Sequence, residues 1–153
     1  MDPPVYSLRP VTDDDYDFLF QLHVATMRPS VEATWGWNEA FQELYFQSRW
    51  DPANQHIVSI GKIDVGTITV EEEIGTVFLN LIEIRPEYQG RGLGTALIRD
   101  VLRDAHNRDL PVKLHVLKTN LRARQLYERL GFTILEERKE RHVMINSPAT
   151  KLA

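Results

Sequence analysis

A glycine-rich segment, Gln89-Gly90-Arg91-Gly92-Leu93-Gly94-Thr95, lies between a strand-like run and an amphipathic helical pattern. The first turn of a helix leaves backbone N–H groups without partners and carries partial positive charge. Glycines let these N–H groups converge on a phosphate with no Cβ in the way, and Arg91 adds a full positive charge. The segment therefore predicts a phosphate-binding turn. The alternative is a connection that only turns a corner.

Two common nucleotide-binding motifs do not fit this turn. The P-loop requires G-x-x-x-x-G-K-S/T, a pattern that the sequence lacks. The dinucleotide fingerprint G-x-G-x-x-G fails as well, because Thr95 or Leu97 stands where its third glycine would be required. We therefore expect a different phosphate-containing ligand.

The turn and a second block resemble the GNAT superfamily of N-acetyltransferases. Gln89, Gly92 and Gly94 satisfy its acetyl-coenzyme A motif, Q/R-x-x-G-x-G/A, after a strand that ends in I-R-P-E-Y. Residues 120–132 resemble the family block N-x-x-A-x-x-L-Y-x-x-x-G-F, and the opening L-R-P-V-T-D-D-D-Y resembles the first strand and helix start. Good matches cover residues 76–135. Two blocks in the right order and spacing are more specific than either alone.

The resemblance implies direct transfer of an acetyl group from acetyl-coenzyme A to a primary amine of a small molecule or a peptide. No covalent acyl-enzyme is needed, which agrees with the absence of cysteine. The pyrophosphate would rest on the glycine turn, and the pantetheine arm would lie along the preceding strand. A backbone N–H near Ile84 would polarise the acetyl carbonyl. The implied cofactor-binding residues are Ile82, Ile84, Gln89, Gly90, Arg91, Gly92, Leu93, Gly94, Thr95 and Asn120.

A general acid must protonate the departing thiolate, and the resemblance assigns this role to Tyr127. A tyrosine hydroxyl, with an ordinary pKa of about 10, can donate to a thiolate whose conjugate acid has a pKa of about 8–9. The alternative is a core aromatic, because Tyr127 lies four residues after Ala123 on an amphipathic helix. Asn120 is predicted to cap that helix as well as to contact coenzyme A.

The general base is less well defined by the sequence. The family often carries a glutamate at the position of Phe78, which cannot serve. Glu83 is the only acid in the strand-like run 76–84, yet alternation sets it on the face opposite Phe78, so a bulge would have to re-aim it. Glu83 is the candidate base, with a solvated or salt-bridged carboxylate as the alternative. Glu71–Glu73 are predicted to form a charged turn.

The acceptor amine is expected near Trp35-Gly36-Trp37-Asn38-Glu39, a segment between the first two predicted helices. In the family this region forms one wall of the acceptor cleft. Trp35 and Trp37 are the candidate substrate-binding residues, as an aromatic wall for an apolar or cationic amine. The alternative is that both tryptophans pack into the core.

The elements that must position these residues follow from periodicity and from Gly and Pro breaks. Pro29 is predicted to end the first helix, and Asn38 to cap a second whose inner face is Ala40, Phe41, Leu44 and Tyr45. A strand, a helix and a strand from 76 to 117 form a βαβ-type unit, so the sheet should be mixed. The predicted strands are 5–10, 56–60, 63–70, 76–84, 112–117, 132–135 and 142–145, with a fourth helix at 120–130.

We therefore expect one α/β (mixed α+β) domain over residues 1–146, with a GNAT-like fold, and a frayed tail over 147–153. Its sheet should be mixed and splayed, with six or seven strands flanked by about four helices. A non-catalytic acyl-coenzyme A-binding or sensing module on the same fold is the alternative to an enzyme.

Composition excludes several classes of function. The 153 residues include no cysteine, which excludes disulfides, iron–sulfur ligation and a thiol nucleophile. The five histidines show no metal-ligand spacing, so no metal is expected. No apolar run approaches a membrane span, and the N-terminus does not resemble a secretory signal, so a cytoplasmic protein without a membrane partner is expected.

Charge is distributed unevenly along the chain, whose net charge is −4. Residues 1–84 hold four basic and fourteen acidic side chains, and residues 85–153 hold fourteen basic and eight acidic ones. The basic half indicates either a polyanionic ligand or solvated helix surface. Nucleic acid is not expected, because no basic run is interleaved with aromatics. The oligomeric state stays open, although closing strands in this family often pair across a homodimer.

Overall fold

The computed structural model describes residues 4–149, which form one seven-stranded sheet and four α-helices. The strand order is β1-β2-β3-β4-β5-β7-β6. The strands are β1 (Ser7–Pro10), β2 (Gln55–Ile60), β3 (Ile63–Glu73), β4 (Thr76–Ile84), β5 (Val112–Leu117), β6 (Thr133–Glu137) and β7 (Arg141–Asn146). The helices are α1 (Tyr16–Trp35), α2 (Glu39–Ser48), α3 (Leu93–Asn107) and α4 (Leu121–Arg129). Short 3₁₀ turns cover Asp13–Asp15 and Pro86–Tyr88.

The sheet is mixed, as predicted. β4 and β5 pair in parallel at Val77–Val112 and Phe78–Lys113, whereas β1–β2, β2–β3, β5–β7 and β6–β7 pair antiparallel. Mixed pairing of this kind follows from the βαβ connection through α3, because parallel neighbours require a crossover. The predicted α/β class is therefore confirmed.

Contacts divide the chain into two compact units. The first unit comprises the described residues up to Thr69 together with Leu81–Leu93, and the second comprises Val70–Asn80 and the described residues from Gly94 onward. β3 and β4 therefore contribute to both units. The domain boundary at residue 146 stays a prediction, and residues 150–153 of the predicted tail lie outside the described residues.

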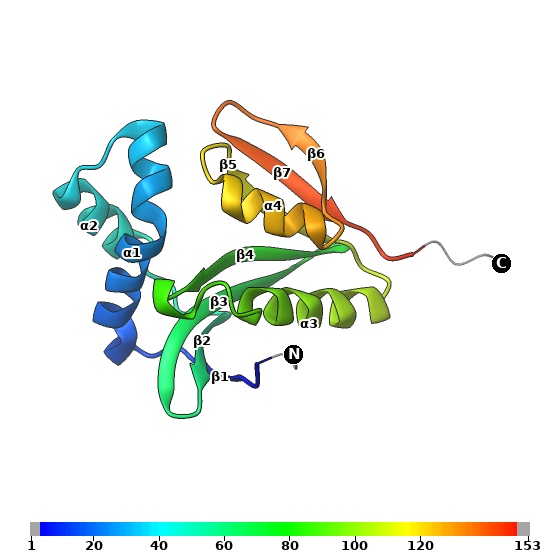
Figure 1. Ribbon diagram of the computed structural model, residues 1–153, viewed down its shortest axis with the longest axis horizontal. Coiled ribbons are helices and arrows are strands. Elements are labelled where there is room, and N and C mark those ends of the chain that lie inside the picture. Colours follow the sequence, from blue (N-terminus) through cyan, green and yellow to red (C-terminus); the bar gives the residue numbers. More distant parts are fainter. Residues whose placement is uncertain (1–3, 150–153) are drawn as a thin grey trace. The chain divides into compact units, whose positions relative to one another are not determined.

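In the first unit, α1 and α2 lie side by side (Figure 1). Leu19 and Leu22 of α1 form a buried cluster with Val11 and Ile57. Burying each of these side chains contributes about 2 kcal/mol. Three aromatic side chains pack against the cluster: Phe18, Phe46 and Trp50.

The start of α1 is fixed by Asp15. Its Oδ2 accepts a hydrogen bond from the backbone N–H of Thr12 at 2.9 Å, in a capping box. The Arg9 guanidinium donates to both carboxylate oxygens at 2.9 Å. These contacts join β1 to the first turn before α1.

Two predictions for this region are wrong. α1 continues through Pro29 to Trp35, because residues beyond the proline, Ser30 and Val31, are buried and tertiary packing outweighs the one lost backbone hydrogen bond. Asn38 caps α2 as predicted, accepting from the N–H of Phe41 at 2.9 Å. The predicted inner face is nevertheless exposed at Phe41, Leu44 and Tyr45. The buried residue of α2 is Gln42.

In the second unit, β5 occupies residues 112–117 as predicted, and its side chains Val112, Leu114 and Val116 are buried. The unit also buries Leu97 and Ile98 of α3 and Met144 of β7. Tyr127 of α4 is buried in the same unit.

Glu71–Glu73 lie in β3 instead of forming the predicted turn, which is another correction. The strand can extend this far because its carboxylates find partners: the Arg108 guanidinium binds Glu72 at 2.8 and 3.1 Å, and the Asn80 amide donates to Glu71 at 3.0 Å. The chain reverses two residues after Glu73, at Gly75, whose φ is +72°.

β3 approaches the end of β4 very closely at Gly66. A Cβ placed on Gly66 would lie 2.5 Å from the carbonyl oxygen of Glu83. The register of β2 against β3 also shifts at Val58/Ser59, opposite this point. No helix within residues 4–149 combines the length and apolar character that a membrane crossing needs.

Candidate active site

The predicted phosphate turn follows the end of β4 and opens α3. Gly90 and Gly92 have φ values of +74° and +84°, in the left-handed region that favours glycine. The side-chain amide of Gln89 donates to the carbonyl of Ile84 at 2.8 Å, which ties the turn to the strand. α3 begins at Leu93, so Gly94 and Thr95 lie in its first turn, where backbone N–H groups are available to an anion.

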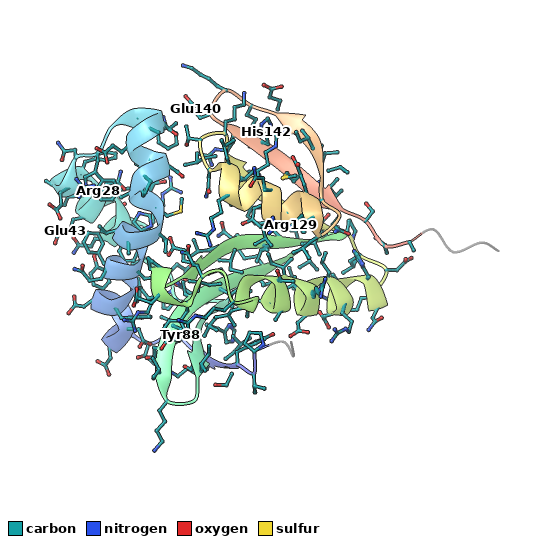
Figure 2. All side chains as sticks on the ribbon, viewed as in Figure 1. Arg28, Glu43, Tyr88, Arg129, Glu140 and His142 are labelled. Atoms are coloured by element: carbon teal, nitrogen blue, oxygen red, sulfur yellow. The ribbon has the colours of Figure 1, made fainter. Side chains whose placement is uncertain are left out.

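Positive side chains accompany this turn. The guanidinium groups of Arg91 and Arg85 lie 5.3 and 5.9 Å from the ring centre of Tyr88, a residue that Figure 2 labels. Arg85 also forms an ion pair with Glu87 at 2.9 Å, whereas Arg91 is exposed. The left-handed glycines, the helix start and Arg91 together fit a pyrophosphate.

Glu83, the candidate base, is buried. Its side chain is 3% exposed. Strand alternation predicted that it would lie on the face opposite Phe78. In the structure it contacts α1, where Thr26 Oγ1 lies 3.0 Å and His23 Nδ1 lies 3.4 Å from its Oε2. The Glu83 carboxylate is therefore enclosed by the protein, and it forms an ion pair with His23 when that ring is protonated.

His23 is a residue that the sequence did not single out. Its ring is 19% exposed, more than Glu83, and lies 5.6 Å from the ring of Phe46. Burial lowers the pKa of His23, but the hydrogen bond and negative charge of Glu83, helped by Gln42, outweigh it and raise this pKa above its ordinary value. Thr26 and His23 are one helical turn apart, but no sequence signal connects either of them to Glu83.

Tyr127, the candidate general acid, is buried in the second unit against Phe132, with ring centres 5.8 Å apart. Burial raises the pKa of Tyr127 to about 12. Its hydroxyl therefore keeps its proton over the whole physiological range. The packing agrees with a core aromatic, and the protonated hydroxyl agrees with an acid.

Asn120 caps α4 as predicted, because its Oδ1 accepts from the N–H of Ala123 at 3.2 Å. The cap uses the carbonyl end of the side chain. A contact between Asn120 and coenzyme A stays a prediction.

The two candidate acceptor residues differ in their surroundings. Trp35 is the last residue of α1 and is exposed, so it does not pack into the core. Trp37 is half-buried, with the guanidinium of Arg28 (labelled in Figure 2) 5.3 Å from its ring centre. The indole N–H of Trp37 is buried and has no hydrogen-bond partner among the described residues. An unpaired buried donor costs about 1–3 kcal/mol, which a ligand acceptor atom would recover.

Within the described residues, no group of three or more acidic or histidine side chains is placed to hold a metal ion. The candidate site residues thus fall into two sets. The turn, Ile82, Ile84, Glu83, Trp35 and Trp37 belong to the first unit, except that Gly94 and Thr95 continue into the second. Tyr127 and Asn120 belong to the second unit.

Comparison with known proteins identifies the family. The model of the acetyltransferase (GNAT) family matches residues 16–132 of this chain. The chain belongs to the GNAT family. The matched range includes both sequence blocks. It also includes Glu83 and its neighbours His23, Thr26 and Gln42.

Solved structures of GNAT proteins share the fold. The PaiA N-acetyltransferase from Thermoplasma acidophilum, in complex with coenzyme A, is 14% identical, with a TM-score of 0.73 over 94% of this chain and 99% of that chain. Arabidopsis thaliana Naa50, in complex with the bisubstrate analogue CoA-Ac-MVNAL, is 22% identical, with a TM-score of 0.63 over 93% and 98% of the two chains. The predicted GNAT-like fold is confirmed.

One curated relative is similar over part of its length. The mycothiol acetyltransferase of Streptomyces coelicolor is 41% identical over 70 residues, which make up 45% of this chain. The matched part spans 22% of the length of that relative.

Proposed function

We propose that this GNAT protein transfers the acetyl group of acetyl-coenzyme A directly to a primary amine of a small molecule or a peptide. The observation that carries the proposal is the turn at the start of α3, with left-handed Gly90 and Gly92 and with Gln89 bonded to the strand end. The coenzyme A in the PaiA structure and the analogue in the Naa50 structure support the same ligand class.

In this proposal the backbone N–H groups of residues 89–95 hold the pyrophosphate, and Arg91 adds charge. The pantetheine arm lies along the backbone of Ile82 and Ile84, and Asn120 contacts the coenzyme through the part of its side chain that the helix cap does not use. The N–H of Ile84 donates to the acetyl carbonyl, a contact typically worth about 3 kcal/mol in the transition state.

The reaction needs one proton donor and one proton acceptor. Acetyl-coenzyme A supplies the thioester, whose carbon–sulfur bond breaks as the amine nitrogen forms a bond to the carbonyl carbon. Tyr127 donates its phenolic proton to the leaving sulfur. Glu83 provides the carboxylate of the general base, which removes the proton that the attacking nitrogen must lose.

The acceptor is proposed to bind beside Trp35 and Trp37. The exposed ring of Trp35 offers apolar contact, and the Trp37 ring already stacks with a cationic group, Arg28. An amine that carries a hydrogen-bond acceptor would also satisfy the indole N–H of Trp37. The exposed Trp35 ring suits an apolar or cationic amine, and the Trp37 indole N–H suits an amide-bearing one.

Isothermal titration of the purified protein with acetyl-coenzyme A and with dephosphorylated pantetheine tests the first step. Micromolar binding that requires the nucleotide end is expected, because the turn recognises the pyrophosphate. A panel of small amines and peptides, with free thiol release as the readout, then tests transfer. The assignment of the turn would be refuted if pantetheine bound as tightly as acetyl-coenzyme A. It would also be refuted if the protein bound neither ligand.

A non-catalytic acyl-coenzyme A-binding module is the second candidate. It is favoured by one observation, the presence of Phe78 where the family often carries glutamate. Binding of acetyl-coenzyme A with no thiol release on the whole amine panel would support this module. Thiol release that depends on an amine would exclude it.

A further inference from the structure

The first unit contains a polar cluster formed by His23 and Thr26 of α1, Gln42 of α2 and Glu83 of β4. Glu83 of β4 places Oε2 within 3.0 Å of Thr26 Oγ1 and 3.4 Å of His23 Nδ1, both on α1. Gln42 of α2 is buried beside the same histidine and contributes a hydrogen bond to it. Glu83 is buried and His23 is partly buried. A buried carboxylate that faces an ionisable ring is a candidate for a functional role.

Thr26 cannot satisfy Glu83 at all times. Its hydroxyl oxygen lies 2.9 Å from the carbonyl of Leu22 and 3.0 Å from Glu83 Oε2, and a hydroxyl has only one hydrogen to donate. When that hydrogen turns to Leu22, the ring of His23 is the donor that faces Oε2. The carboxylate therefore holds the ring with Nδ1–H directed at it.

Glu83 and His23 differ in how far their side chains are exposed to solvent. The Glu83 side chain is 3% exposed, whereas the His23 side chain is 19% exposed. A group that takes a proton from a bound substrate must be within hydrogen-bond reach of it or one water away. His23 meets this condition better than Glu83 does.

We infer that His23 takes the proton from the acceptor's ammonium group, while Glu83 orients the ring and balances its charge. The inference rests on the proposed acetyl transfer and refines its base. An N–H bond of the ammonium breaks, its proton passes to the imidazole, and the electron pair left on nitrogen attacks the thioester carbonyl. The carbon–sulfur bond then breaks, the leaving sulfur takes the proton of Tyr127, and the second proton that nitrogen loses as the amide forms restores the Tyr127 hydroxyl. The cluster changes from imidazole and carboxylate to imidazolium and carboxylate, so its net charge rises from −1 to zero.

The direction in which turnover changes with pH follows from the groups that surround His23. Glu83 from β4 and Gln42 from α2 face the ring and raise the pKa of His23, Phe46 of α2 is the apolar neighbour, and burial opposes the shift. Below this raised pKa the ring already holds a proton and cannot accept another. Turnover should therefore fall on the acid side as the pH drops through the pKa of His23.

Two measurements on the full chain test the inference. The first follows the histidine side-chain resonances by ¹⁵N-edited NMR across pH 5–9, with His23 assigned from His23→Gln. The pKa of His23 should lie above the ordinary value for histidine, and Glu83→Gln should lower it. The second records kcat/KM against pH for an amine that the panel identifies. Its acid limb should coincide with the NMR midpoint.

Variants separate catalysis from packing. His23→Gln should lower kcat/KM by roughly 10²-fold at pH 8 and remove the acid limb. Glu83→Gln, which keeps the ring, should move the acid limb to lower pH together with the pKa of His23. His56→Gln, on β2 of the same unit, should leave both kcat/KM and the position of its acid limb unchanged. A purely structural role would lower activity equally at every pH.

The outcomes distinguish this inference from the proposed function. Amine-dependent turnover whose acid limb is unchanged in His23→Gln and in Glu83→Gln would overturn the role of His23 and leave acetyl transfer intact. If His23→Gln does not fold, the test rests on Glu83→Gln alone. In that variant the acid limb of kcat/KM must move to lower pH together with the pKa of His23. Binding of acetyl-coenzyme A without transfer to any amine would refute the proposed function, and the inference with it.

Discussion

Tyr127 illustrates how burial fixes the protonation state of a single side chain. In water a tyrosine loses its proton at a pKa of about 10. In this protein burial raises the pKa of Tyr127 to about 12, so the hydroxyl keeps its proton over the whole physiological pH range. The same shift makes this phenol a weaker acid than a tyrosine in water, so proton transfer to a departing thiolate would require that the site raises the pKa of the thiol as well.

Replacing Tyr127 by phenylalanine removes this hydroxyl and keeps the ring that packs on Phe132. Tyr127→Phe should lower kcat by roughly 10²-fold or more, with little loss of affinity for acetyl-coenzyme A. Steady-state kinetics and titration calorimetry measure the two effects. Tyr16→Phe, at the start of α1, is the matched control, and unchanged turnover in Tyr127→Phe would remove the residue from the mechanism.

Individual residues were predictable where a local pattern defines them. Gln89, Gly92 and Tyr127 stand in short motifs whose spacing is visible in the sequence. The partners of Glu83 are not visible in this way, because 57 residues separate it from Thr26 and nothing local marks His23 as its neighbour. Only the packing of α1 on the strand end brings these side chains together.

At the scale of elements, the junction between β4 and α3 depends on glycine conformation. Gly92 has a φ of +84°, and a Cβ there would meet only Pro4, at 3.8 Å. Gly92→Asp should abolish acetyl-coenzyme A binding in titration calorimetry, because its carboxylate would repel the pyrophosphate.

Gly61→Asp provides the control for backbone strain. Gly61 also has a left-handed φ, +60°, with open space around it, but it lies in the β2–β3 turn. The Gly61→Asp variant should retain full affinity for acetyl-coenzyme A. Retained affinity in Gly92→Asp as well would contradict the assignment of the turn.

Elements were predictable where local chemistry sets their ends. Asn38 and Asn120 cap helices through bonds to N–H groups three residues later, which sequence spacing reveals. Pro29 and Glu71–Glu73 were misread because distant contacts overrule local preference there. The exposed face of α2 was misread for the same reason, since the helix turns Gln42 inward toward His23.

At the scale of the whole molecule, the free energy of unfolding at acid pH should depend on Asp15. The Arg9 guanidinium, by its hydrogen bonds, outweighs burial and holds the pKa of Asp15 below its ordinary value. A carboxylate of this kind stabilises the fold above its unfolded pKa of about 3.9, and the contribution is lost as the pH falls through the lower, folded pKa.

Urea unfolding from pH 3 to pH 7 measures this contribution. Asp15→Asn should lower the free energy of unfolding at pH 7 by about 1–3 kcal/mol, because Arg9 and the N–H of Thr12 lose a charged acceptor. The difference between the variant and the wild type should shrink toward pH 3. Asp14→Asn, an exposed neighbour, should change stability little, and equal losses in both variants would contradict the role of the Arg9 contact.

The uneven charge along the sequence also finds a structural explanation. Several basic side chains of the C-terminal half form ion pairs at the surface, each worth about 0–1 kcal/mol, so these side chains are solvated surface and are separate from Arg91 at the glycine turn. These pairs are Asp100–Arg103, Asp104–Arg108, Glu72–Arg108, Lys118–Glu137, Arg124–Glu128 and Glu136–Arg138. Composition alone could not reveal this pairing.

The close approach at Gly66 limits which sequences can adopt this fold. The atoms that a Cβ at position 66 would meet, the Glu83 carbonyl oxygen at 2.5 Å and the Ile84 Cα at 3.3 Å, belong to the backbone and cannot rotate away. Gly75 has open space around it and is constrained only by its left-handed φ, which asparagine and aspartate tolerate. In a library of all single substitutions selected for folded protein, position 75 should accept these two residues, and position 66 should accept glycine alone.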